Sequence, residues 1–353
     1  MTATNGRIPG LDLARAAAIF GMIVVNFELA MHASGRGPAW LSALTGALQG
    51  RAAGLFVVLA GIGASLGARR ALSSGDPVAR RAARRQLVRR GLALFALGVA
   101  FMSVWDADIL HFYGVYFLVG AALLFAPAGA LIAAIGLSSA TAVMHLANGG
   151  WAARWDFTTL TYRGLWTPGG FLRNLVLDGW HPVLPWVALY LFGMLLGRSR
   201  LADRVWRRRA GLVALFVWSS VEVCARMVAP DGIETIGPRA LAATTCFPPT
   251  PAYLIAASAA ALTLIALSCE VAERAHGPTL RALEATGRLS LTLYLGHVLV
   301  GLGALESLGR LEDRSLHFAV AASVTFFAAS VAFAAVWTRR FQSGPLEALL
   351  RRL

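Results

Sequence analysis

The feature that most constrains this chain is a series of long apolar runs separated by short charged or turn-rich stretches. A helix needs about 20 apolar residues to cross the ~30 Å hydrocarbon core of a bilayer, and ten runs approach that size. They cover residues 11–31, 52–68, 88–105, 109–126, 129–147, 182–197, 210–229, 251–270, 289–308 and 316–338. With 57% apolar residues, 14% charged residues and a mean hydropathy of +0.64, the chain is not a water-soluble globular protein. We predict an all-α, polytopic integral membrane helical bundle of about 10 transmembrane helices, forming a single transmembrane domain over residues 1–353.

The charged residues predict how this bundle is oriented. All 32 basic residues are arginines, and against 18 acidic residues they give a formal net charge of +14. The arginines cluster between the apolar runs and not on one polar domain, which argues against a nucleic-acid partner and is typical of membrane topology. If both termini are cytoplasmic, 23 arginines and seven acidic residues lie inside, whereas nine arginines and eleven acidic residues lie outside. This asymmetry predicts that both termini are cytoplasmic.

Two acid–histidine pairs lie at the predicted external ends of helices. Glu28 and His32 are four residues apart on the first helix, and Asp108 and His111 are three apart on the fourth. Both spacings place the two side chains on one helix face. A carboxylate there holds one imidazole tautomer and raises its basicity, as a general base requires. The alternative is that these histidines are merely solvated by headgroups and water at the interface.

Two further polar groups lie deeper in the apolar runs. Asn26 is a neutral donor and acceptor suited to holding a carbonyl oxygen, or it forms a hydrogen bond between helices. On an unbroken helix it points away from His32, so the two converge only if the helix ends or bends before His32. His297 lies near the middle of the ninth run, three residues after Tyr294. An ionisable group at that depth is a functional candidate, although Tyr–His pairs also serve packing.

The predicted external loop at 148–181 is rich in aromatic residues. They form either a belt at the membrane interface or a cover over a substrate groove, because aromatic rings also stack on sugars. The sequence contains no Cys/His cluster with metal-ligand spacing and no Gly-x-Ser-x-Gly elbow, so we expect no metal. Any catalysis therefore depends on histidines, carboxylates and amides.

Five segments, in order along the chain, resemble motifs of the bacterial YeiB-like membrane proteins. These segments are Arg7–Arg15 followed by an apolar run to Asn26, Leu55–Gly63, Asp108–Tyr113, Gly287–Leu295, and Gly344–Glu347 before Arg351. That family is similar to the transmembrane acyltransferases that include heparan-α-glucosaminide N-acetyltransferase. The string His32-Ala33-Ser34 also matches a local His-Ala-Ser string of the heparan enzyme.

The resemblance implies transfer of an acetyl or other short acyl group from cytoplasmic acyl-CoA, with acetyl-CoA the expected form. The acceptor is a hydroxyl or amine on an extracytoplasmic glycan, glycolipid or small molecule. On this hypothesis His32, oriented by Glu28, deprotonates the acceptor and Asn26 polarises the thioester carbonyl. His111 with Asp108 is a second candidate base. The candidate substrate-binding residues are Tyr113, Tyr294, His297, Asp12 and Arg15.

Several alternatives remain open from the sequence. The same polar groups suit a proton-coupled transporter or exporter of a small molecule, or a membrane partner protein without chemistry. The cytoplasmic arginines between Arg69 and Arg90 either hold the phosphates of CoA or only set the topology. We expect a multi-pass protein of the bacterial plasma (inner) membrane. The oligomeric state is undetermined, and a homodimer is one possibility.

Overall fold

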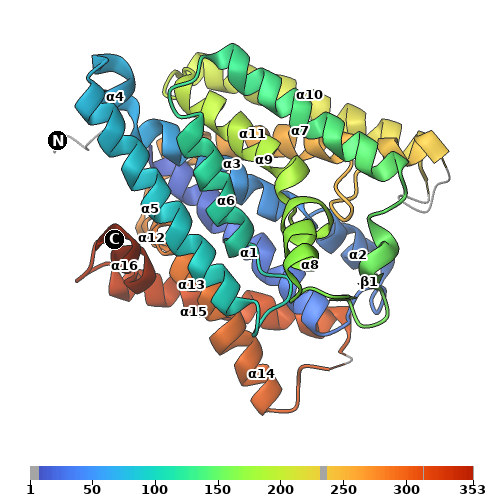
Figure 1. Ribbon diagram of the computed structural model, residues 1–353. Coiled ribbons are helices and arrows are strands. Elements are labelled where there is room, and N and C mark those ends of the chain that lie inside the picture. The colour runs from blue at the N-terminus through green and yellow to red at the C-terminus, as the bar shows by residue number, and fades with distance from the viewer. Residues whose placement is uncertain (1–7, 231–236, 313, 353) are drawn as a thin grey trace. The chain divides into compact units, whose positions relative to one another are not determined.

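The computed structural model describes residues 8–230, 237–312 and 314–352, and the regular structure in these ranges is almost entirely helical (Figure 1). The motif residue Arg7 lies outside them. The one sheet in this part of the chain is an antiparallel pair, β1 (Trp155–Asp156) and β2 (Thr161–Tyr162). The prediction of an all-α fold is confirmed. The residue contacts gather into two compact units, and the prediction of a single domain over the whole chain stays a prediction.

The first unit joins the chain up to Phe56 with Ala261–Arg352. Its elements are α1 (Pro9–Ala30), α2 (Ala39–Gly46), the start of α3 (Arg51–Gly67), the end of α11 (Pro251–Arg274), α12 (Pro278–Arg288), α13 (Ser290–Gly296), the π-helix η5 (His297–Leu302), α14 (Gly303–Ser307), α15 (Leu316–Trp337) and α16 (Pro345–Arg352). Helix α1 packs against both α12 and α15. At Gly287 a Cβ atom would lie 1.8 Å from the carbonyl oxygen of Asp12, so only glycine permits this approach of α12 to α1.

Helix α1 has a defined beginning and end. Pro9 occupies its first turn, where a missing N–H costs nothing. The helix ends at Ala30, and His32 adopts a left-handed conformation with φ of 48°. The backbone N–H groups of Met31 and Ala33 turn back to the carbonyls of Phe27 and Glu28. The chain therefore leaves the helix direction just before His32.

The second unit comprises Val57–Ala260. Besides β1, β2, the rest of α3 and the beginning of α11, its elements are α4 (Arg69–Ser74), α5 (Pro77–Phe101), α6 (Leu110–Ala122), α7 (Ala128–Ala147), the 3-10 helix η1 (Ala152–Arg154), α8 (Pro168–Arg173), the π-helix η2 (Asn174–Asp178), α9 (Val183–Arg198), α10 (Arg204–Val228) and the 3-10 helix η4 (Gly237–Ala242). Helices α5 and α6 pack along each other, and α7 packs against α9. A Cβ atom at Gly61 would lie 2.0 Å from the carbonyl oxygen of Tyr190, which shows how closely α3 approaches α9.

Each of the ten predicted runs coincides with a helix or a bent helix pair. Six helical segments in the described ranges are long and apolar enough to cross a membrane, and two bent pairs raise the number to eight. One pair, Pro168–Asp178 with Val183–Arg198, bends by 47°, and the other, Pro278–Arg288 with Ser290–Ser307, bends by 76°. The remaining two runs correspond to α5, whose first half is rich in arginine, and to α6, which has only 13 residues. The polytopic architecture is confirmed, whereas ten spans and the cytoplasmic termini stay predictions.

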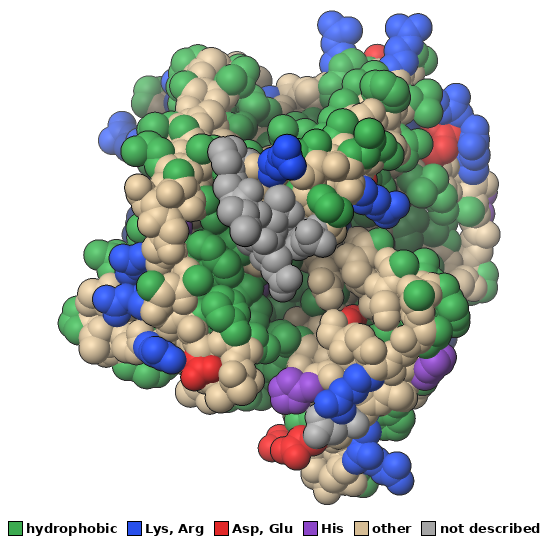
Figure 2. All heavy atoms as spheres, turned by 90° about the vertical axis from the view of Figure 1, so that its right-hand side faces the viewer, with side chains coloured by type: hydrophobic (Ala, Val, Ile, Leu, Met, Phe, Trp, Pro, Cys, Tyr) green, Lys and Arg blue, Asp and Glu red, His purple; other side chains and the backbone are tan. Residues whose placement is uncertain are grey.

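Large apolar side chains are exposed on several of these helices. Hydrophobic side chains cover much of the face drawn in Figure 2. On α10, Leu212, Phe216 and Met227 are 67%, 73% and 78% exposed. Apolar surface of this extent is expected where a helix faces lipid, because water would disfavour it. The protein is a multi-pass membrane protein.

Candidate functional sites

The first candidate site lies in the first unit and joins residues that are 271 positions apart. The amide nitrogen Nδ2 of Asn26, on α1, lies 2.8 Å from Nε2 of His297, the first residue of the π-helix η5. His297 is buried and Asn26 is partly buried. Both residues were predicted candidates, but the sequence did not pair them with each other.

A backbone contact fixes the tautomer of His297. Its Nδ1 forms a hydrogen bond with the carbonyl oxygen of Tyr294, and a carbonyl only accepts, so Nδ1 carries the proton. Nε2 then holds a lone pair, and the Asn26 amide donates to it. The ring of Tyr294 packs against the imidazole with centroids 5.2 Å apart. Single π-helical turns inside α-helices often occur at functional sites, and here such a turn begins at the histidine.

The predicted contact between Glu28 and His32 is wrong. Because α1 ends at Ala30, His32 is no longer one helical turn above Glu28, and its side chain is exposed. Glu28 is 4% exposed and its Oε1 accepts a hydrogen bond from the Ser34 hydroxyl at 3.0 Å. Its Oε2 is buried without a hydrogen-bond partner among the residues that the structure describes. The role of His32 as a base stays a prediction.

The second predicted acid–histidine pair is formed. In the second unit Oδ2 of Asp108 lies 3.0 Å from Nδ1 of His111, and it also accepts from the backbone N–H groups of Leu110 and His111. The Asp108 carboxylate thereby binds the first two N–H groups of α6, whose N-cap residue is Ile109. Both side chains are buried, with exposures of 0% and 1%. The His111 Nε2 has no hydrogen-bond partner within the described ranges, so the ring is oriented but enclosed.

The remaining predicted residues are divided between the two units. In the first unit Asp12 is buried and forms an ion pair of 2.6 Å with Arg15 at the start of α1. Tyr294 belongs to the His297 site. In the second unit Tyr113 is buried against Tyr116, with ring centroids 5.6 Å apart. The role of each in substrate binding stays a prediction.

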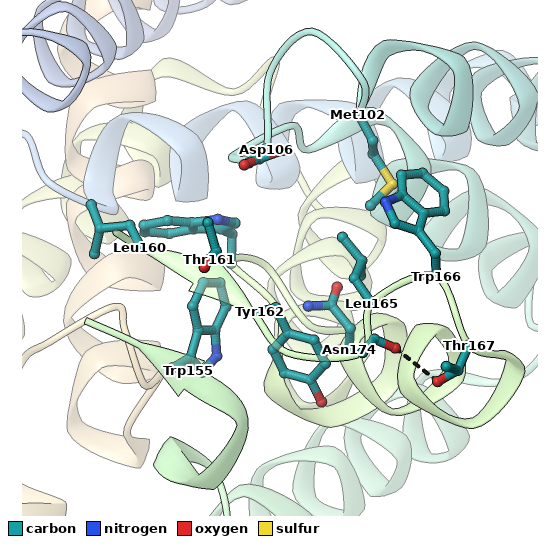
Figure 3. A pocket seen from close by; sticks show the side chains of 12 residues that line it. Met102, Asp106, Trp155, Leu160, Thr161, Tyr162, Leu165, Trp166, Thr167 and Asn174 are labelled. Carbon is teal, nitrogen blue, oxygen red and sulfur yellow. Dashed lines mark hydrogen bonds between the residues drawn. The ribbon is translucent and has the colours of Figure 1, made fainter. Parts of the chain in front are cut away.

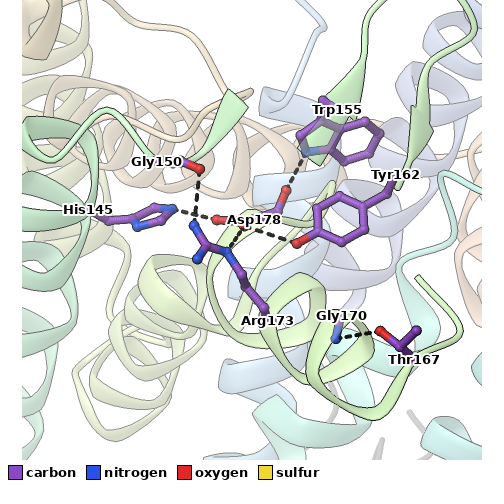
Figure 4. Close-up of polar contacts among 8 residues, drawn as sticks. All are labelled: His145, Gly150, Trp155, Tyr162, Thr167, Gly170, Arg173 and Asp178. Atoms are coloured by element: carbon purple, nitrogen blue, oxygen red, sulfur yellow. Dashed lines mark hydrogen bonds and ion pairs between the residues drawn. The ribbon is translucent and has the colours of Figure 1, made fainter. Parts of the chain in front are cut away.

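A further polar cluster surrounds Asp178 and was not predicted from the sequence (Figure 4). Its carboxylate accepts from His145 Nε2 at 2.5 Å, from Arg173 Nε at 2.5 Å and from the Tyr162 hydroxyl at 3.0 Å. The Asp178 carbonyl accepts from the Trp155 indole at 2.8 Å. Burial and the nearby carboxylate raise the pKa of Tyr162, so its hydroxyl stays protonated and donates. Irregular spacings along the sequence separate these five residues, so no periodic pattern marks them.

A pocket of about 450 Å³ lies beside this cluster, within the second unit (Figure 3). One wall comes from the turn after α5, with Met102 and Asp106. The opposite wall comes from the aromatic 148–181 segment. Its aromatic lining residues are Trp155, Tyr162, Trp166 and Trp180. Of the two interpretations of these aromatic residues, the wall of a groove fits this part of the loop.

Two family models match the chain. Residues 7–227 match the model described as heparan-alpha-glucosaminide N-acetyltransferase, catalytic, and residues 196–353 match a protein family of unknown function, DUF418. The first match covers more than half of the chain. The chain belongs to the heparan-alpha-glucosaminide N-acetyltransferase catalytic family. No curated protein matches the chain.

The two matches divide the candidate residues of this acetyltransferase family member. Asn26, the Asp108–His111 pair and the Asp178 cluster fall within the acetyltransferase match, whereas His297 falls within the DUF418 match. Together the two matches cover residues 7–353. They confirm the predicted resemblance to YeiB-like membrane proteins, which also spans nearly the whole chain. The contact between Asn26 and His297 therefore joins a residue of each matched region.

Proposed function

We propose that this protein is an acyltransferase of the bacterial plasma membrane. It moves an acetyl or other short acyl group from cytoplasmic acyl-CoA to a hydroxyl or amine of an extracytoplasmic glycan, glycolipid or small molecule. The observation that carries the proposal is the contact between Asn26 and His297 in a member of an acetyltransferase family. A buried, neutral imidazole with a fixed tautomer beside an amide donor suits base-assisted acyl transfer.

The reaction assigns one role to each side chain of the pair. The acceptor O–H or N–H loses its proton to Nε2 of His297 while its oxygen or nitrogen attacks the thioester carbonyl carbon. The Asn26 amide turns its N–H to the carbonyl oxygen, where negative charge develops. The tetrahedral intermediate then collapses, the C–S bond breaks, and the leaving thiolate takes the proton from the imidazolium. The acyl group ends on the acceptor, and free CoA is released.

The order of importance of the histidines follows from their surroundings. His297 is buried and oriented, whereas His32 is exposed and has no contact with Glu28. We therefore place His297 first as the base and keep His32 and the Asp108–His111 pair as further candidates. The arginines between Arg69 and Arg90 are the candidates to hold the phosphates of CoA, and the alternative is that they only set the topology.

The test uses membrane vesicles with radiolabelled acetyl-CoA and candidate acceptors. We expect His297→Ala to lower transfer by about 10²- to 10⁴-fold, the usual contribution of a general base, and Asn26→Ala to lower it as well. His317→Ala, a change of an exposed histidine on α15, is the matched control and retains the wild-type rate. If His297→Ala transfers label as fast as wild type while His32→Ala or His111→Ala does not, the assignment of the base is overturned.

A second candidate function is proton-coupled transport of a small molecule, and the bent helix pairs favour it. Transporters often build their sites from interrupted helices, and one pair here bends by 47° and the other by 76°. Purified protein in liposomes without acyl-CoA separates the two functions. Substrate flux under a proton gradient, together with no acyl transfer to any acceptor, would replace the acyltransferase proposal with transport.

A further inference from the structure

The pocket of the second unit combines aromatic walls with two polar groups that have no protein partner. Trp155 and Trp180 meet edge to face with centroids 5.2 Å apart, and Trp180 stacks on Phe247 behind it. Trp166, at the opposite end in Figure 3, is 65% exposed and presents its indole to the opening. The pocket is therefore a partly open cleft, and its Trp155 and Trp180 walls are held in place by aromatic packing.

Asn174 supplies the buried polar group. The residue is 5% exposed, and its side-chain amide makes no hydrogen bond with any residue in the described ranges. The amide points into the pocket between Tyr162 and Leu165 (Figure 3). An amide that lines a pocket and has no hydrogen bond to a described residue is available to donate to and accept from a polar group of a ligand.

Asp106 supplies the charge. Asp106 is an exposed residue whose carboxylate lines the pocket from the turn between α5 and α6, and its partial burial there raises the pKa of the carboxyl. It makes no ion pair with a described residue, and no arginine or histidine of the described chain lines the pocket. The residues that line the pocket carry one negative charge, whereas Arg154 and Arg173 lie behind the lining residues Gly164 and Tyr162. The lining itself therefore favours a cationic ligand over an anionic one.

We propose that this pocket binds a small ligand through an alkylammonium group, which sits against the indole faces and the Asp106 carboxylate. Aromatic faces attract ammonium cations through their quadrupole, and the carboxylate neutralises the charge. The Asn174 carbonyl accepts from an N–H or hydroxyl of the same ligand. The site shares no residue with the Asn26–His297 pair and goes beyond the proposed acyl transfer.

Two sources share this chemistry: a dissolved amine such as choline or ethanolamine, and the headgroup of a phospholipid. The probe is choline, titrated into the purified full-length protein and followed by tryptophan fluorescence and calorimetry. Its matched control is 3,3-dimethylbutanol, which has the same shape without the charge. We expect choline to bind at least about fivefold more tightly than the neutral analogue, because a partly exposed cation–π and carboxylate contact stabilises by ~1 kcal/mol.

Variants test which residues carry the binding. Asp106→Asn is expected to remove the preference for choline over the neutral analogue, and Asn174→Ala to weaken both ligands. Asp156→Asn, on β1 of the same segment but outside the pocket lining, leaves both affinities unchanged. Melting curves of the variants report whether the fold is retained. Equal affinity for choline and its neutral analogue, or unchanged choline affinity in Asp106→Asn, overturns the proposal.

Nanodiscs distinguish the two sources. Choline binding is compared in discs of phosphatidylethanolamine and in discs of phosphatidylglycerol. If the ligand is a lipid headgroup, phosphatidylethanolamine competes with choline and weakens its binding. If the ligand is a dissolved amine, choline binds equally in both kinds of disc. Either result supports an alkylammonium site, and absence of choline binding in both disc types overturns it. The His297→Ala variant is expected to bind choline as wild type does. A failure of the choline-site proposal is therefore distinguishable from a failure of the acyltransferase proposal.

Discussion

The two units hold buried polar clusters of opposite character. In the second unit the carboxylate of Asp178 receives three side-chain donors, and its carbonyl receives a fourth. In the first unit the described partners of His297 are the Asn26 side chain and the backbone around Tyr294. The Asp178 cluster is satisfied by the protein itself, whereas in the Asn26–His297 pair the basic nitrogen of the imidazole contacts a neutral amide.

This difference separates a structural role from a chemical one. A buried carboxylate that is surrounded by donors is stable only when all of them are present, so it ties the elements that supply them into one arrangement. An imidazole whose basic nitrogen faces a single neutral amide exchanges that partner for a substrate at small cost. We therefore assign the Asp178 cluster to the stability of the second unit and the Asn26–His297 pair to reactivity.

The largest effect is expected from Asp178→Ala. This substitution leaves the Arg173, His145 and Tyr162 donors without their acceptor, and because Arg173 is 37% exposed we expect a loss of about 3 kcal/mol, the upper end for hydrogen bonds to a charged group. Thermal unfolding of the detergent-purified protein measures the loss, and Asp156→Ala on β1 is the control with a small change. If the variant melts at the same temperature as wild type, the Asp178 cluster does not stabilise the second unit.

A smaller effect is expected from Glu347→Ala in the first unit. The Glu347 carboxylate accepts from the backbone N–H groups of Leu291 and Thr292, at 2.7 and 3.1 Å, and from the Thr292 hydroxyl at 2.6 Å. It therefore caps α13, and loss of such a cap costs about 2 kcal/mol. The same melting experiment applies, with the exposed Glu306→Ala as control. If the two variants melt alike, the cap contributes nothing measurable.

Asn26→Ala is expected to change stability still less, by about 1 kcal/mol, because it removes one hydrogen bond between neutral groups. A double-mutant cycle with His297→Ala isolates the energy of the contact. We expect this variant to lose acyl transfer while most of the protein stays folded. A variant that unfolds as readily as Asp178→Ala would make the pair structural.

The smallest effect concerns pH and choline binding at the aromatic pocket. Only the ionised Asp106 carboxylate attracts the ammonium group, so affinity falls as pH drops through the pKa of that carboxyl. Burial raises this pKa above its usual 3.8, so the fall begins at a higher pH than for an exposed aspartate. Tyr162 also lines the pocket but stays neutral in this range. Calorimetric titrations between pH 4 and 7 are expected to show a several-fold decrease that Asp106→Asn lacks.

The helices were predictable from the sequence because apolar runs are a local property. All ten runs coincide with helices or bent pairs. The Asp108–His111 contact was also predictable, because the two residues are only three positions apart at the beginning of a helix. The Glu28–His32 contact failed for a local reason as well. The spacing rule assumes an intact helix, and α1 ends at Ala30.

The contacts that define the two clusters depend on tertiary structure instead. Asn26 and His297 were both identified as polar groups in apolar runs, but no spacing rule connects residues on helices that are 271 positions apart. Asp178 gathers His145, Tyr162 and Arg173 from α7, β2 and α8 at irregular separations. Its one sequence signal is an acidic residue in a segment rich in aromatic residues and close to the next apolar run.

The cap on α13 has a consequence for how the protein is made. Glu347 follows Leu291 by 56 residues and His297 by 50, so a ribosome delivers the cap well after it has delivered the helix that carries the histidine. Asn26, in contrast, is synthesised 271 residues before His297, so it lacks this partner until the later segment is made. An interrupted translation product that lacks Glu347 therefore already contains both members of the pair, yet its α13 begins without a cap. Synthesis of the segment that carries Glu347 then becomes the step that secures the helix leading to His297.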